Sequence, residues 1–190
     1  EIKHLLELGY KKKDIAIFYR TNAQSRIVEE GMIKNNFPYK VVGAYYFYKR
    51  KEIKDLLSYL RLISNTADDE SLVRIINEPK RGIGNKTIQT LAASAKEKNI
   101  SMYDAIDSGK ELTFKNIIED CRHKKDDSSL TELIDYIMEK SGMKETLELE
   151  KSLEADLRIE NLMEFRSITE TYQRETGTVN LNDFLEDISL

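Results

Sequence analysis

Residues 77–87 read Asn77-Glu78-Pro79-Lys80-Arg81-Gly82-Ile83-Gly84-Asn85-Lys86-Thr87 and join two helical patterns. The pattern before them is a short helix whose apolar side is Leu72, Val73, Ile75 and Ile76. Pro79 must stop that helix, because proline lacks an amide hydrogen and disfavours helix in the residue before it. The pattern after them repeats at helical spacing through Ile88, Leu91, Ala92 and Ala95, which predicts a second helix that starts near Asn85, a good N-cap.

Two glycines around one apolar residue predict a sharp turn whose backbone amides face outward. Ile83 is expected to anchor this hairpin between the helices, while Lys80, Arg81 and Lys86 supply positive charge. Amides, basic side chains and the positive end of a helix dipole together suit a phosphate oxygen. The alternative is a glycine turn of any two-helix hairpin, and the residues alone leave both interpretations open.

The composition limits the class of protein. A chain of 190 residues with a formal net charge of −4 is not basic overall, so nucleic-acid binding must come from local clusters. Such clusters occur at Lys11–Lys13, at Lys49–Lys51 with Lys54, and around the hairpin, although each is also compatible with a solvated face. The chain opens at Glu1 without a methionine, so we expect a fragment of a longer polypeptide.

Disulfides, metal sites and membrane segments are not expected. Cys121 is the single cysteine, and His4 and His123 have no ligand partners at metal spacing. The sequence contains no apolar run of membrane-spanning length and no signal peptide. We therefore expect a reducing, cytoplasmic setting.

The first 42 residues predict a strand-helix-strand unit. A short helix through Ile2, Leu5 and Leu6 ends at Gly9, and the apolar run 15–19 has the length of a buried strand. A helix from about Asn22 then leads past Pro38 to a second strand at 39–42, parallel to the first by expectation.

Arg20, Thr21 and Asn22 follow the first predicted strand, at the edge where open α/β sheets bind ligands. Arg20 could bind a phosphate, and Thr21 or Asn22 could donate to a sugar-phosphate backbone. A helix cap with a solvated arginine explains the same residues.

From residue 43 onward the pattern is helical, so we place a domain boundary between residues 42 and 43. The aromatic connector 43–48 precedes a helix that carries Ile53, Leu56, Leu57 and Leu60 on its apolar side. These aromatics could stack bases beside the basic cluster, or they could pack in the core. The helix that starts near Asn85 should end at Asn99. Further helices are predicted over 101–106, from Ser129 with a Ser129/Glu132 capping box to Gly142, over 153–172, and from about Asn182, whereas 108–127 is weakly patterned.

No catalytic constellation is present in the sequence. It lacks the G-x-x-x-x-G-K-[ST] and G-x-G-x-x-G loops, and we interpret Glu52, Asp55, Asp68 and Asp69 as helix caps and surface charges. We therefore predict a mainly α chain without catalytic or metal-binding residues of its own: a helical bundle with a helix-hairpin-helix-like turn, preceded by a small α/β piece.

Three motifs in order resemble the UvrD/PcrA-type DNA helicases: residues 19–26 (YRTNAQSR), 47–55 (FYKRKEIKD) and 79–84 (PKRGIG). The resemblance covers nearly the whole chain and weakens between 108 and 127, where we expect the sequence to be shorter than the family and to lack a helix. It implies that residues 1–42 belong to the RecA-like domain 2A and residues 43–190 to the helical insertion domain 2B.

The resemblance also implies site residues. Arg20, Thr21, Asn22 and Arg50 would contact the translocating single strand, and Arg81, Gly82, Ile83, Gly84, Asn85, Lys86 and Thr87 would grip duplex phosphates ahead of the fork. ATP and Mg²⁺ would bind elsewhere in the parent, an ATP-driven 3′ to 5′ helicase of repair and plasmid replication. Its partners would be DNA, its other domains and repair, replication or transcription proteins. The alternative implied function is an autoregulatory or protein-interaction domain with little DNA affinity.

Overall fold

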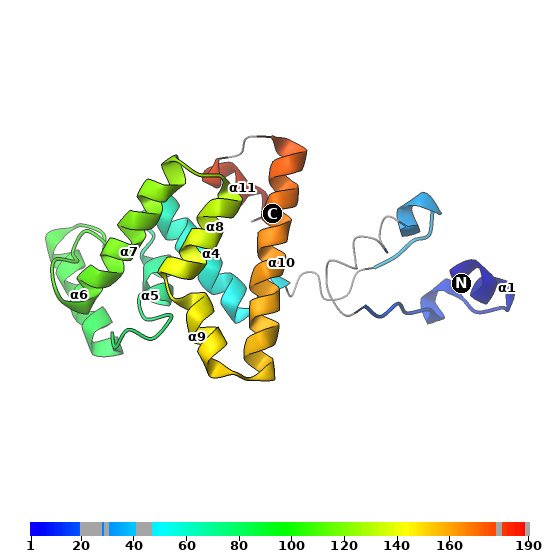
Figure 1. The fold of residues 1–190 in the computed structure, drawn as a ribbon, viewed down its shortest axis with the longest axis horizontal. Helices are drawn as coiled ribbons and strands as arrows, with labels where there is room; N and C mark the ends of the chain where they lie inside the picture. Colours follow the sequence, from blue (N-terminus) through cyan, green and yellow to red (C-terminus); the bar gives the residue numbers. More distant parts are fainter. Residues whose placement is uncertain (20–27, 29–30, 41–46, 178–179, 189–190) are drawn as a thin grey trace. The chain divides into compact units, whose positions relative to one another are not determined.

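A computed structural model describes residues 1–19, 28, 31–40, 47–177 and 180–188 of the chain (Figure 1). The chain divides into two compact units, Glu1–Tyr45 and Tyr46–Leu190. The described residues are helical or irregular, without any strand. The prediction of a mainly α chain is confirmed.

The first unit contains helix α1 (Ile2–Glu7), the 3-10 turn η1 (Lys12–Asp14) and a helical stretch over 31–34. Gly9 has φ +93°, so the predicted end of α1 is confirmed. The strand predicted over 15–19 is wrong, because this segment has no strand pairing and Phe18 is 94% exposed. An apolar run becomes a strand only beside a hydrogen-bonding neighbour, and the described residues supply none. Of the strand predicted over 39–42, residues 39 and 40 are irregular and the others lie outside the described part.

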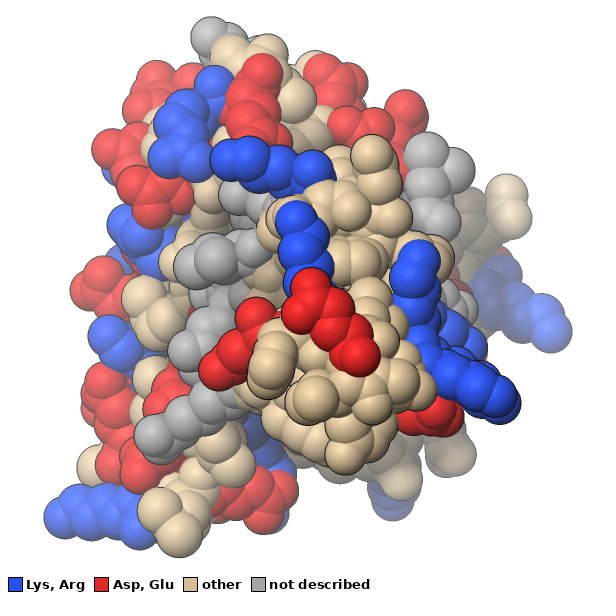
Figure 2. Space-filling model, turned by 90° about the vertical axis from the view of Figure 1, so that its right-hand side faces the viewer, with Lys and Arg blue, Asp and Glu red and all other residues tan. Residues whose placement is uncertain are grey.

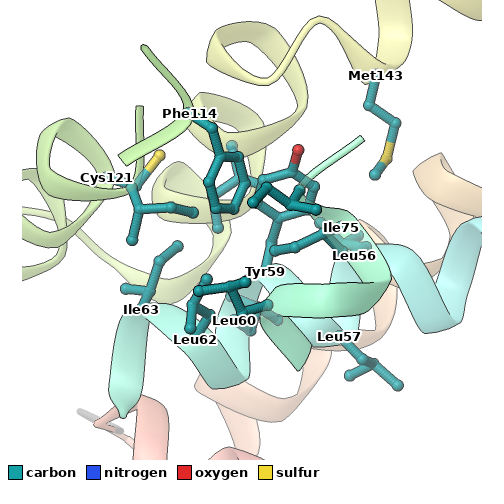
Figure 3. Close-up of a cluster of buried hydrophobic side chains, with 14 of the residues drawn as sticks. Leu56, Leu57, Tyr59, Leu60, Leu62, Ile63, Ile75, Phe114, Cys121 and Met143 are labelled. Atoms are coloured by element: carbon teal, nitrogen blue, oxygen red, sulfur yellow. The ribbon is translucent and has the colours of Figure 1, made fainter. Parts of the chain in front are cut away.

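The second unit is a bundle built around helix α4 (Lys51–Ser64). Helix α4 packs against α5 (Asp69–Ile75), α7 (Gly109–Asp126), α8 (Leu130–Lys140), α10 (Leu153–Thr176) and α11 (Leu181–Asp187) (Figure 1). The bundle is completed by α6 (Asn85–Lys98) and α9 (Met143–Glu150). A helix with neighbours on most sides is buried on most sides, and ten of the 14 residues of α4 are buried. Its predicted apolar face is buried, and so are Tyr59, Leu62 and Ile63 (Figure 3).

Local signals place several helix ends correctly. Ser129 and Glu132 form the predicted capping box, and Gly142 follows α8 with φ +76°. Helix α6 begins at Asn85 as predicted, although the N-cap is Gly84, and it ends at Asn99 in the left-handed conformation. Asp68 caps α5 through the Ser71 amide, as its assignment to a cap predicted.

Helix α7 was not predicted. Only Phe114, Ile118 and Cys121 of its 18 residues are buried, at a spacing of four and three residues. This single apolar stripe is too narrow to stand out in a segment rich in charge. Phe114 nevertheless lies in the centre of the core, 6.5 Å from Tyr59 between ring centroids (Figure 3).

Candidate nucleic-acid interface

The hairpin between α5 and α6 is a turn that buried apolar side chains anchor to the bundle. Ile76 and Ile83 are 0% and 2% exposed, so the expectation that Ile83 anchors the turn is confirmed. Gly82 adopts φ +72°, a conformation that favours glycine, whereas Gly84 is extended with φ −91° and ψ 170°. Gly82 and Gly84 are both exposed, so the backbone of the turn faces solvent.

Asn77 closes the loop from inside. Its Oδ1 accepts hydrogen bonds from the amides of Arg81 at 2.8 Å and Ile83 at 3.1 Å. These two amides therefore do not face outward, contrary to the sequence-based expectation for the whole turn. The first-turn amides of α6 remain available, because Gly84 has no side chain that could cap them. The open backbone donors are thus concentrated at the start of α6.

Arg81 points into the bundle. Its guanidinium donates to the carbonyl oxygens of Ile75, Pro79 and Ser141 and to the Tyr59 hydroxyl, at distances of 2.8–3.2 Å. It also lies 5.5 Å from the centroid of the Phe114 ring. An arginine with this many internal acceptors has few donors left for a phosphate.

Tyr59 connects Arg81 to the rest of the loop. Its hydroxyl accepts from Arg81 and donates to the carbonyl oxygen of Glu78 at 2.7 Å. Burial raises the pKa of Tyr59 to about 12, although Arg81 acts in the opposite direction. The phenol is therefore neutral at physiological pH and keeps its proton for Glu78. The hydrogen bonds of Tyr59 and Arg81 join the loop to α4.

An ion-pair network holds the other side of the loop to the start of α4. Lys51 Nζ lies 2.6 Å from Glu78 and 3.1 Å from Asp55, and Arg74 lies 2.7 Å from Asp55. Burial would lower the pKa of Lys51, but its hydrogen bonds to Glu78 and Asp55 outweigh this effect and raise it. Asp55 is 4% exposed, so its interpretation as a surface charge is wrong: it is a buried partner of two cations.

Arg50 is engaged with helix α10. It donates to the side chain of Asn161, whose amide donates to Glu52 at 2.6 Å, and it lies 5.4 Å from the Phe47 ring centroid. Glu52 is 8% exposed, which also contradicts its interpretation as a surface charge. Phe47 is buried, which favours core packing over base stacking for this aromatic. Arg20, Thr21 and Asn22 lie outside the described residues.

The cations that remain on the outside of the hairpin are lysines. Lys80 and Lys86 are exposed and form no ion pair with any described residue. Elsewhere, basic and acidic side chains are interspersed on the face drawn in Figure 2. Lys80 and Lys86 are therefore a local source of positive charge on a chain whose net charge is −4.

A pocket of about 470 Å³ lies behind the loop, between the start of α4 and helices α9 and α10. It is lined by Lys51, Lys80 and Arg158 but also by Glu52, Asp55, Glu78 and Glu150. This mixture of charges does not select for an anion. The outer surface of the hairpin is the better candidate for a phosphate site.

Three residues of this site were missed by sequence reasoning. Asn77 follows the C-cap of α5 and lies two residues before Pro79, and asparagine is typical of turns, so its loop-closing role had a usable sequence signal. Tyr59 counts as one more apolar residue of α4, and Ser141 contributes only its carbonyl. No sequence pattern marks either as a partner of Arg81.

Comparison with known proteins agrees with the three motifs. The family model of the UvrD-like helicase C-terminal domain matches residues 1–190. The ATP-dependent DNA helicases PcrA of Staphylococcus aureus (strain Mu50) and Staphylococcus epidermidis (strain ATCC 35984) are both 44% identical to this chain over 195 residues. Each alignment covers 96% of this chain and 27% of the relative, so the chain spans about a quarter of the length of these relatives.

Neither a membrane-spanning helix nor a metal site occurs among the described residues. Among them, no helix combines the length and the apolar character needed to cross a membrane. No three of their His, Cys, Asp and Glu side chains are grouped so that they could hold a metal ion.

Proposed function

The chain belongs to the family of UvrD-like helicase C-terminal domains, and we propose that it is the duplex-gripping region of an ATP-dependent 3′ to 5′ DNA helicase. In this proposal residues 1–42 are part of the RecA-like domain 2A, and the sheet of that domain is completed by residues of the parent. Residues 43–190 are the helical insertion domain 2B. The hairpin 81–87 binds phosphates of the duplex ahead of the fork.

One observation supports this function above the others. The hairpin presents α6 amides without a side-chain cap, together with Lys80 and Lys86, which are exposed and form no ion pair with the residues that the structure describes. Amides and mobile ammonium groups bind phosphate without reading bases. Asn77 and Arg81 keep the loop rigid, so the donors need little reorganisation when they meet a phosphate. The grip should therefore be independent of DNA sequence.

Nucleotide chemistry is assigned to other parts of the parent. ATP and Mg²⁺ require a phosphate loop and acidic metal ligands, and the described side chains do not form such a site. We also propose that Arg20, Thr21, Asn22 and Arg50 contact the translocating single strand. Arg50 uses one guanidinium nitrogen for Asn161, so its other N–H groups remain for a phosphate.

Duplex binding measured against salt tests the proposal. Fluorescence anisotropy with a short blunt duplex should give a slope of log K against log salt of about −2 to −3, which corresponds to two or three phosphates. Lys86→Ala should make the slope less steep by about 0.9. Lys98→Ala is the matched control, because Lys98 is exposed in the last turn of the same helix, roughly 18 Å along its axis. Equal slopes for all three proteins would contradict a grip at the hairpin.

A second candidate function is an autoregulatory or protein-binding surface. Three leucines around the α9–α10 turn favour it, since Leu149, Leu153 and Leu157 are 70%, 84% and 59% exposed. Exposed apolar clusters often mark interaction sites. Binding of a partner that is abolished by Leu153→Ser and insensitive to Lys86→Ala, in a chain without salt-dependent duplex binding, would favour this function over the first.

A further inference from the structure

Lys110, at the start of α7, lies directly against the glycine turn. A Cβ atom built on Gly82 would stand 2.6 Å from Lys110 Nζ and 3.7 Å from its Cδ and Cε. Gly82 and Lys110 are far apart in sequence, and the segment around Lys110 carries no motif of the family. The fold alone brings this lysine to the hairpin.

The position of Lys110 is set by the core. Phe114 follows it by one helical turn, so both side chains are on the same face of α7. The Phe114 ring is 0% exposed and lies under the Arg81 guanidinium. The contact that orders Arg81 therefore also fixes the face of α7 from which Lys110 reaches Gly82.

The charge of Lys110 is not neutralised by a partner. Its side chain is exposed and forms no ion pair with any residue that the structure describes. The neighbouring carboxylate of Glu111 lies instead beside Gly109, 2.6 Å from the Cβ position of that glycine. An ammonium without a carboxylate partner is available for an external anion.

The location is also electrostatically unfavourable in the free protein. Lys110 is the second residue of α7, and Lys86 is the second residue of α6, whose first turn contains no acid. A cation near a helix N-terminus opposes the helix dipole. Residues placed against a helix dipole in this way are frequently functional. An anion bound near these helix ends would offset the unfavourable interaction of each lysine with its helix dipole.

We infer that Lys110 is a further phosphate-binding residue of the hairpin, and that it acts with Lys86 and the first-turn amides of α6 on the phosphodiester backbone of duplex DNA. This inference rests on the proposed function and adds a residue from a third segment of the chain. It also gives a second reason for glycine at position 82. A side chain there would occupy the space that the Lys110 ammonium uses.

Salt-dependent anisotropy with the same blunt duplex tests the inference, using Lys110→Ala, Lys110→Arg and the control Lys98→Ala. Removal of one phosphate contact should make the slope less steep by about 0.9 and weaken binding about eightfold at 0.1 M salt. Lys110→Arg should retain the slope, since it keeps the charge. The thermal midpoint of Lys110→Ala should not fall, because alanine relieves the unfavourable dipole interaction.

The outcomes separate the two proposals. If Lys86→Ala changes the slope and Lys110→Ala behaves like the control, the duplex grip stands and the assignment of Lys110 is wrong. If Lys110→Ala weakens binding only because its midpoint has dropped, the lysine is structural and the assignment is again wrong. If the unchanged chain shows no salt-dependent duplex binding at 50 mM salt, both proposals are refuted.

Discussion

Replacement of Arg81 by methionine should destabilise the helical unit without removing a phosphate contact. Methionine keeps the apolar stem of the side chain over Phe114 and deletes the guanidinium. The deletion removes the guanidinium donor from four acceptors: the carbonyls of Ile75, Pro79 and Ser141 and the Tyr59 hydroxyl. The Ile75 carbonyl keeps a second hydrogen bond, from the Glu78 amide. The hairpin loop would lose one of its connections to α4, the hydrogen bond from Arg81 to Tyr59.

The magnitude follows from these contacts. Each lost hydrogen bond costs about 1 kcal/mol, and loss of the cation–π contact adds about 0.5–1 kcal/mol. Water can reach part of this half-buried site and recover some of the loss. We therefore expect the free energy of unfolding to fall by about 3 kcal/mol, which lowers the thermal midpoint by about 9 °C for a domain of this size.

Urea unfolding followed by circular dichroism measures the change, and Cys121 provides an independent probe. Its thiol is 0% exposed, and burial raises its pKa to about 12. A thiol reagent should therefore react only with opened molecules, and much faster in the Arg81→Met variant. Lys80→Met is the matched control, because it removes the same charge from an exposed neighbour without an ion-pair partner among the described residues.

Two results would refute this reasoning. Arg81→Met could unfold at the same urea concentration as Lys80→Met, which would show that the internal hydrogen bonds contribute little. Alternatively, Arg81→Met could keep its stability and make the salt slope of duplex binding less steep by about 0.9, which would show that the guanidinium contacts a phosphate.

The other predictions concern the two glycines of the hairpin, amide exchange in residues 15–19 and ATP hydrolysis. Gly82→Ala should lower the free energy of unfolding by about 1–2 kcal/mol, because residue 82 has φ +72°. Gly84→Ala has open space at its Cβ position, so it should keep the stability and weaken duplex binding. Equal stability of the two variants would contradict this. Amides of 15–19 should exchange with solvent much faster than those of α4, and similar protection would mean that the apolar run is paired. The chain should show no ATP hydrolysis above background with DNA and Mg²⁺, and turnover that copurifies with it would contradict the assignment of the motor to other parts of the parent.

Sequence reasoning was most successful where the determining interactions are local. The capping box of Ser129 and Glu132 and the glycine at position 142 are contained within one helix and its ends, so α8 could be located from residue types alone. The hairpin between α5 and α6 was found for the same reason, since a proline, two glycines and two apolar repeats lie within one short segment.

It failed where the outcome depends on distant partners. The run 15–19 has strand composition, but a strand needs a neighbour to which its amides and carbonyls can bond. Helix α7 has a three-residue apolar stripe whose importance becomes visible only when Phe114 is seen against Tyr59. Asp55 has the sequence environment of a surface acid, and its burial depends on Arg74, which approaches from α5, in addition to Lys51 of its own helix.

The charges of the hairpin depend both on local sequence and on partners that are distant in the chain. The sequence predicts three cations beside the glycines, Lys80, Arg81 and Lys86. The structure likewise has three exposed cations there, but they are Lys80, Lys86 and Lys110. The identity of one of them differs, because the Tyr59 hydroxyl and the Ser141 carbonyl draw Arg81 inward while α7 brings Lys110 outward to Gly82. A salt slope of about −2 to −3 for the unchanged chain therefore fits both assignments. Single replacements of Arg81 and Lys110 distinguish them, because the first should change stability and the second should change the slope.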